Sequence, residues 1–260
     1  MNTAELINPS TNQLTSFTLH LADTNLILAQ RNGEWCAHGP ILEQDIAITN
    51  ITLDLIGQAR NFYQYAAAVI NSSSTTEGIT ATEDSLAYLR TEREFKNLLI
   101  TELPNGDWGE TVLRQFFYSV YAQLLYSRLL ESNDAQLSAI AEKSLKEVAY
   151  HVKWSSEWVI RLGDGTEESH TRMVKAVENL WAYTGEFFVP APYEEGLVEV
   201  NALKEQWLQK VSAVMDEATL PQPADGYMHT GGKAGMHTEH MGFILADLQY
   251  LQRTYPGATW

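Results

Sequence analysis

The chain has 260 residues, of which 45% are hydrophobic, and this length and composition suit a soluble globular protein with a substantial core. Thirty-three Asp and Glu residues against 17 Lys and Arg residues give a formal net charge of −16, which argues against nucleic acid or anionic membranes as partners. No apolar run is long enough to span a membrane, the polar N-terminus lacks the order of a signal peptide, and one cysteine, Cys36, cannot form a disulfide framework. We therefore expect a cytoplasmic protein that binds neither nucleic acid nor membrane.

Apolar residues recur at helical spacing along most of the chain, and no stretch alternates as a strand would. The first helix is expected from Leu14 to about Asn32. A second begins after Gly39-Pro40, because proline is favoured in a first turn, and it continues to a polar loop over residues 71–82. A third helix is expected over residues 84–102.

The fourth helix, expected over residues 111–130, is apolar nearly all round, as is typical of a helix in the middle of a bundle. A fifth is expected over residues 135–162, followed by shorter helices over residues 168–188, 199–218 and 238–254. Long helices joined by short turns predict an all-α protein with four core helices and additional peripheral helices.

Two of the long helices carry half of a metal-binding motif. In ferritin-like di-iron proteins, a Glu-x-x-His motif on each of two helices and a carboxylate from each of two others hold the metal. Here the carboxylates are present as Asp54 and Glu147, but Gly57 and Tyr150 stand where the histidines should be. Neither glycine nor a neutral tyrosine replaces an imidazole, so the pattern predicts the frame of a di-iron protein without its iron.

The fourth helix bears on the same question, because it has no Asp or Glu between Glu110 and Glu131 and offers Gln and Ser instead. One interpretation is a degraded iron site that uses Asp54, Glu147, His151 and an acid from the first helix. The other is a structural polar layer, in which the carboxylates bind neighbouring polar groups. One histidine and a carboxylate-free helix are too little for two irons, so we favour the structural layer, with these positions as vestiges of a site.

The segment from Thr230 to Gly242 is rich in glycine and histidine. A zinc site and a phosphate-binding loop are both conceivable, but the order of residues matches neither the His-Glu-x-x-His motif nor a P-loop. We expect no catalytic residue here. Two roles remain open, partner docking and the structure of the entry to the last helix, and the side chains that would serve either role are Lys233, His237, Glu239 and His240.

Six segments spread over the chain resemble a known family. They are QRNGEWCAHGP (Gln30–Pro40), NITLDLIGQARNF (Asn50–Phe62), LPNGDW (Leu103–Trp108), KEVAYH (Lys146–His151), LWAYTGEFF (Leu180–Phe188) and TGGKAGMHTEHMG (Thr230–Gly242). In these segments the chain is similar to the family of the C component of phenylacetyl-CoA epoxidase (phenylacetate-CoA oxygenase), the multicomponent enzyme of bacterial phenylacetate catabolism. The resemblance runs from about Leu14 to Trp260.

The resemblance implies a ferritin-like structural subunit that has no metal and pairs with a related di-iron catalytic subunit, the A component, in a heteromeric complex. The complex inserts one atom of O₂ into the ring of phenylacetyl-CoA as a 1,2-epoxide, with electrons from NADPH. The di-iron centre, NADPH, FAD and Fe–S cofactors are then expected in partner subunits, and none in this chain.

By this resemblance the chain is part of an NADPH-dependent monooxygenase and is not catalytic on its own. The alternative is a self-sufficient ferritin-like metal-dependent oxidase or oxygenase. We expect one ferritin-like domain over residues 1–260, in which residues 1–13 form a mobile tail.

Overall fold

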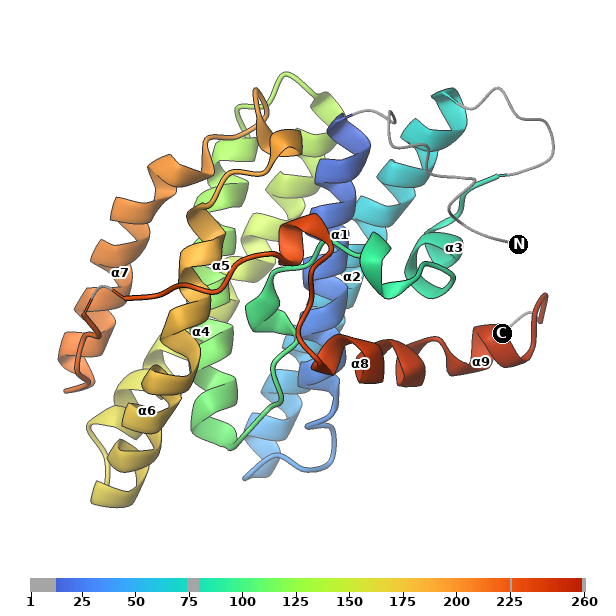
Figure 1. Ribbon diagram of the computed structural model, residues 1–260. Coiled ribbons are helices and arrows are strands. Elements are labelled where there is room, and N and C mark those ends of the chain that lie inside the picture. The colour runs from blue at the N-terminus through green and yellow to red at the C-terminus, as the bar shows by residue number, and fades with distance from the viewer. Residues whose placement is uncertain (1–12, 74–79, 225, 259–260) are drawn as a thin grey trace.

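The computed structural model describes residues 13–73, 80–224 and 226–258, and these are helical without any strand (Figure 1). Four long helices form the core. They are α1 (Gln13–Gly33), α2 (Leu42–Ser73), α4 (Trp108–Leu129) and α5 (Ala135–Gly163). Helix α1 packs along α2, and α4 packs along α5, so the core consists of two helical hairpins. The predicted all-α bundle is confirmed; the tail predicted for residues 1–13 lies outside the described residues, except for Gln13, which begins α1.

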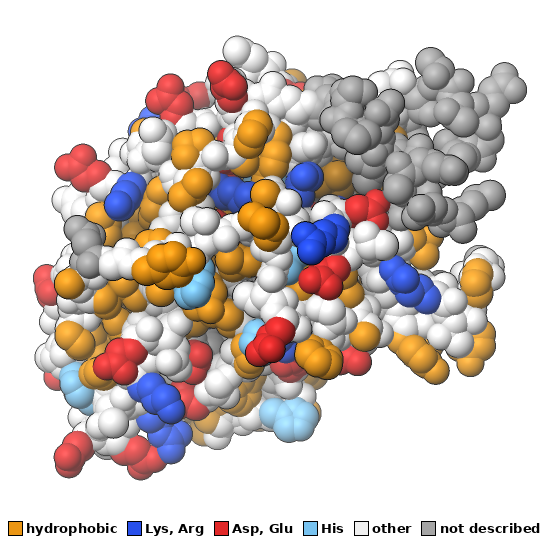
Figure 2. Space-filling model, viewed as in Figure 1, with side chains coloured by type: hydrophobic (Ala, Val, Ile, Leu, Met, Phe, Trp, Pro, Cys, Tyr) orange, Lys and Arg blue, Asp and Glu red, His pale blue; other side chains and the backbone are white. Residues whose placement is uncertain are grey.

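Shorter helices surround this core. They are α3 (Glu83–Tyr88), α6 (Glu167–Leu180), α7 (Lys204–Glu217), α8 (His240–Leu248) and α9 (Tyr250–Thr254). Helices α6 and α7 pack against α4 and α5, whereas the C-terminal segment crosses the front of the bundle and then extends away from it as α8 and α9 (Figure 1). The face in view in Figure 2 carries hydrophobic side chains interspersed with charges of both signs. Among the described residues, none of the helices combines the length and apolar character needed to cross a bilayer.

Helix α4 occupies the centre of the molecule, as its sequence predicts. It begins where the Asp107 carboxylate accepts a hydrogen bond from the backbone N–H of Glu110, a typical N-cap. Its Phe and Tyr side chains are buried, and it is covered by α5, α6 and α7. The indole N–H of Trp207 on α7 donates to the carbonyl of Phe117 at 3.0 Å, which fixes the outer helix on the central one.

The prediction of a continuous third helix over residues 84–102 is wrong. Helix α3 ends at Tyr88, and only two short 3₁₀ turns follow, Glu92–Glu94 and Leu99–Thr101. The reason is a buried carboxylate on α1: Asp23 is fully buried and accepts hydrogen bonds from the Arg90 guanidinium and from the backbone N–H of Lys96, at 2.8 Å. A side chain that bonds the backbone offers it an alternative to the helical pattern.

Candidate functional site

The two half-motifs meet where α2 lies beside α5. His151 Nε2 lies 3.0 Å from Asp54 Oδ2, and the His151 side chain is buried while that of Asp54 is 36% exposed. The amide of Gln58 donates to Glu147 Oε2 at 2.9 Å. Burial raises the pKa of the Glu147 carboxyl above its ordinary value, although the hydrogen bond from Gln58 acts in the opposite direction. Each carboxylate of the half-motifs is therefore engaged by a side chain of the opposite helix.

A chain of hydrogen bonds continues from Glu147 into the middle of the bundle, and we call it the polar layer. Its members are Glu147 on α5, Gln58 on α2, Tyr126 and Tyr118 on α4, and Asn25 on α1. All four core helices contribute. The layer is buried except at Glu147, which is half-buried.

The donors of the polar layer all point in one direction. The Tyr118 hydroxyl donates to Asn25 at 3.0 Å, the Asn25 amide donates to the Tyr126 hydroxyl at 3.0 Å, and that hydroxyl donates to the Gln58 carbonyl at 3.3 Å. The Gln58 amide group then donates to Glu147. Such a chain polarises each successive bond toward the carboxylate. Burial raises the pKa of Tyr126 to about 12, so its hydroxyl stays protonated and available as a donor.

The side chains in this interior do not match the ligands of a di-iron centre. Such a centre needs a carboxylate from each of the other two core helices, and here α4 offers phenols and amides, while Asp23 on α1 is bound by Arg90. A second group of polar side chains also shows that α4 presents neutral groups to the interior. Gln115 accepts a hydrogen bond from Asn32 at 2.7 Å and donates one to Ser119 at 2.9 Å. Within residues 13–73, 80–224 and 226–258, no three His, Cys, Asp or Glu side chains are placed to share a metal ion.

The positions where the motif would require histidine lie toward the outside. Tyr150 is 46% exposed, and its ring meets that of His151 edge-on with centroids 6.4 Å apart. A Cβ atom added at Gly57 would meet nothing within 4 Å. The residues that point inward stand one place further along each helix, at Gln58 and His151.

Replacing Tyr126 by Phe is expected to lower the free energy of unfolding by about 1–3 kcal/mol, because the Asn25 amide loses one of its two acceptors and the Gln58 carbonyl loses its donor inside the core. Urea unfolding measures the loss. Tyr250→Phe, at a position that is 61% exposed, is the matched control and should leave stability unchanged. Equal stability of the two variants would contradict a structural polar layer.

The C-terminal segment is anchored by buried ion pairs. Lys233 Nζ lies 2.9 Å from Glu194 Oε1, with side chains 6% and 1% exposed, and it also donates to the carbonyls of Phe187 and Val189. The Glu186 carboxylate accepts from the backbone N–H groups of Gly231 and Gly232, at 2.8 and 2.7 Å. The segment is therefore fixed to the bundle through its interior side.

His237 is held just as firmly. Its Nδ1 lies 2.6 Å from Glu102 Oε1 and its Nε2 lies 3.1 Å from the carbonyl oxygen of Phe95, so both nitrogens face acceptors. Burial lowers the pKa of His237, but the hydrogen bond to the Glu102 carboxylate and its negative charge raise it. The net result is a pKa above the ordinary value of 6.5. Glu102 also accepts from the backbone and hydroxyl of Thr238.

The four candidates of this segment do not converge on one site. Lys233 and His237 point into the protein, Glu239 is exposed, and His240 is half-buried. The contacts of Lys233 and His237 favour the structural role over docking, since their polar atoms are already bound within the chain.

The His237–Glu102 pair predicts a pH dependence of stability. Because the pKa of His237 is raised in the folded protein, the pair stabilises fully below the unfolded pKa of about 6.5, and this stabilisation is lost as the pH rises through the folded pKa. The difference in unfolding free energy between the wild type and His237→Gln should therefore shrink from pH 6 to pH 9. His38→Gln, at an exposed histidine, should show no such trend. A pH-independent difference for His237→Gln would contradict the protonated pair.

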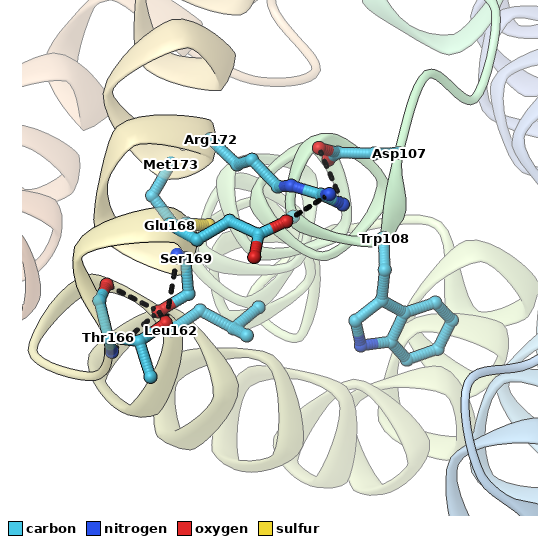
Figure 3. A pocket seen from close by; sticks show the side chains of 9 residues that line it. Asp107, Trp108, Leu162, Thr166, Glu168, Ser169, Arg172 and Met173 are labelled. Atoms are coloured by element: carbon cyan, nitrogen blue, oxygen red, sulfur yellow. Dashed lines mark hydrogen bonds and ion pairs between the residues drawn. The ribbon is translucent and has the colours of Figure 1, made fainter.

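A surface cavity of about 250 Å³ lies between the start of α4, the end of α5 and the start of α6 (Figure 3). Its apolar lining includes Trp108 and Met173, and the Arg172 guanidinium reaches across it toward Glu168 and Asp107. Both carboxylates compete for the arginine, so the cavity offers no free cationic group to an anionic ligand. We do not regard it as an active site.

The fold and its interior define the class of protein: a ferritin-like helical bundle in which amide and phenol groups of three core helices form a chain of hydrogen bonds that ends at one carboxylate. The model of the phenylacetic acid catabolic protein family matches residues 1–260, and the chain belongs to this family. The chain is 47% identical over 255 residues to the C component of the 1,2-phenylacetyl-CoA epoxidase of Escherichia coli (strain K12), and the match covers 96% of this chain and 100% of that protein. The predicted family resemblance is confirmed.

Proposed function

We propose that this chain is a structural, non-catalytic subunit of a phenylacetyl-CoA 1,2-epoxidase and that it supports a separate di-iron catalytic subunit. Its full-length similarity to a protein named as a subunit of such an enzyme supports the reaction. The polar layer supports the division of labour, because α1 and α4 contribute amide and phenol groups to it, and a di-iron centre would need a carboxylate from each of these helices.

The polar layer performs the structural task that metal ligands perform in a di-iron bundle. It connects α1, α2, α4 and α5 through side chains that satisfy one another. Buried polar groups that are all paired specify a unique packing without a bound ion. A bundle held in this way is free to present whole helix faces to another subunit.

The remaining parts of the reaction fall to other chains in this proposal. Activation of O₂ belongs to the di-iron subunit, and electrons from NADPH pass through FAD and Fe–S groups of a reductase subunit. We place the complex in the cytoplasm, where the acidic surface of this chain keeps it apart from membranes and nucleic acid.

Reconstitution tests the proposal. The purified chain, mixed with phenylacetyl-CoA, NADPH and reductase, should form no epoxide and consume no NADPH beyond background. Adding the purified di-iron subunit should restore epoxide formation to a rate above that of the isolated di-iron subunit. Epoxide formation by this chain without the di-iron subunit would establish the alternative, a self-sufficient oxygenase.

A further inference from the structure

The segment between α7 and α8 lies on the bundle without apolar anchors of its own. We call residues 226–239 the strap, and they cross the front of the bundle in Figure 1. The chain on either side is fixed by buried apolar side chains, Leu220 after α7 and Met241 in α8, which are 4% and 0% exposed. Within the strap the only buried side chain is that of Lys233, and Met236 is 56% exposed. Apolar burial therefore fixes the two ends of the strap and not its middle.

Three buried carboxylates hold the middle of the strap. Glu186 accepts hydrogen bonds from two backbone N–H groups of the strap, and Glu194 binds the Lys233 ammonium. Glu102 binds His237 and accepts from the backbone N–H and the hydroxyl of the next residue. The three carboxylates stand in separate segments of the chain, so they contact the strap at three points along its length. The closed position is therefore held by charge and hydrogen bonding.

Two glycines set the position of the strap against the segment that follows α3. A Cβ atom added to Gly232 would lie 2.2 Å from the carbonyl oxygen of Asn97, and one added to Gly235 would lie 2.3 Å from the carbonyl oxygen of Arg93. Gly235 also has a φ of +76°, which residues with a side chain rarely adopt. The strap and the bundle thus meet backbone to backbone, and a small displacement breaks this fit together with the hydrogen bonds to the carboxylates.

The free energy needed to open such a segment differs from that of an apolar one. Apolar side chains lose their burial when they enter water, whereas peptide groups and charges exchange protein partners for water. The charges of a buried ion pair regain hydration when they separate into solvent, and this offsets much of their attraction. Opening also leaves no carboxylate bare inside the protein, unlike removal of one partner by mutation. Segments with few buried apolar contacts are accordingly those that open below the free energy of global unfolding.

We propose that the strap is a conformational device, which opens from the bundle as one unit while α7 and α8 stay in place, and which thereby uncovers Glu102, Glu186 and Glu194. The open state presents three carboxylates to solvent along the front of the bundle. The closed state covers them with Lys233, His237 and the backbone of the strap. Neither state requires the subunit role proposed above, so the two proposals stand or fall separately.

Native-state hydrogen exchange on the full chain tests this device. The amide protons of Gly231, Gly232 and Thr238, which donate to the carboxylates, should exchange with closely similar protection factors. Their protection should be at least about 100-fold lower than that of amides in the middle of α4, such as the amide of Tyr121. Guanidinium at low concentration should leave the protection of the strap nearly unchanged, because its opening exposes little buried surface.

A pair of glycine variants separates opening of the strap from global unfolding. Gly235→Ala adds a methyl group that meets the Arg93 carbonyl, so it should lower the protection factors of the strap at least about tenfold further and leave those of α4 unchanged. Gly257→Ala is the matched control, because Gly257 has a similar φ of +79° but no atom within 4 Å of the added Cβ. It should leave the protection of the strap at the wild-type level.

The wild-type measurement alone is able to overturn the proposal. Strap amides that are protected as strongly as those of α4, or that lose protection steeply with guanidinium, would show that the segment opens only when the whole chain unfolds. Protection factors that differ by more than about tenfold among Gly231, Gly232 and Thr238 would show separate local fluctuations in place of one unit. In Gly235→Ala, a loss confined to the strap supports the device, whereas an equal loss in α4 makes the strap part of the global folding unit.

Discussion

Replacing Arg90 by Ala is expected to lower the free energy of unfolding by about 3–5 kcal/mol, because it leaves the fully buried Asp23 carboxylate without its cationic partner. Besides Asp23, the guanidinium binds the carbonyl of Glu94 at 2.8 Å and lies over the ring of Phe95, with its central carbon 4.2 Å from the ring centroid. Removing it therefore also releases the non-helical segment after α3.

Chemical denaturation measures this loss, and the sequence offers a close control. Arg93 is three residues away and exposed, so Arg93→Ala should change stability by less than about 0.5 kcal/mol. A loss for Arg90→Ala no larger than that for Arg93→Ala would contradict the buried pair. Hydrogen exchange should in addition show faster exchange at the Lys96 amide, which donates to Asp23.

Replacing Lys233 by Ala is expected to cost a similar amount, about 3–5 kcal/mol, because the Glu194 carboxylate is 1% exposed and would be left as an unpaired buried charge. Melting temperature should therefore fall before any change in affinity for a partner subunit is seen. Burial lowers the pKa of the Lys233 ammonium below its ordinary value, although the neighbouring Glu194 carboxylate acts in the opposite direction.

Two variants check the cause of this effect. Lys204→Ala removes an exposed lysine at the start of α7 and should be neutral. Lys233→Met combined with Glu194→Gln removes both charges and should recover part of the lost stability, because no bare carboxylate remains. Lys233→Ala that melts like the wild type but binds the partner subunit more weakly would restore the docking interpretation of this residue.

The helices of the core were predictable because their signals are local. An apolar pattern on all sides identifies α4 over nearly its true length, expected at residues 111–130 and found at Trp108–Leu129. The error at residues 84–102 has the opposite origin. Periodicity there is compatible with a helix, but the buried Asp23, 67 residues before Arg90, binds the segment in another conformation. A partner so distant in sequence leaves no trace in a local pattern.

Some residues of the candidate site could likewise be predicted from the sequence, and others could not. Asp54, Glu147 and His151 could be placed together from the helical spacing of the half-motifs, and the absence of Asp and Glu from α4 after Glu110 favoured a structural layer. Asn25 and Tyr126 were not predicted, since a single amide on α1 and one tyrosine among many on α4 give no distinctive signal. Lys233 could not be assigned from its residue type, because lysine is seldom buried unless a specific carboxylate meets it.

The iron content of the isolated chain is the most direct test of the claim that this bundle is structural and holds no di-iron centre. The purified protein would be loaded anaerobically with excess Fe(II), passed through a desalting column, and assayed for iron and for its Mössbauer spectrum beside the di-iron subunit. Because the polar layer supplies amides and phenols where carboxylates are required, we predict no stoichiometric iron, and none in the Gly57→His/Tyr150→His variant. Two irons retained per chain, with the spectrum of a coupled di-iron centre, would contradict the account.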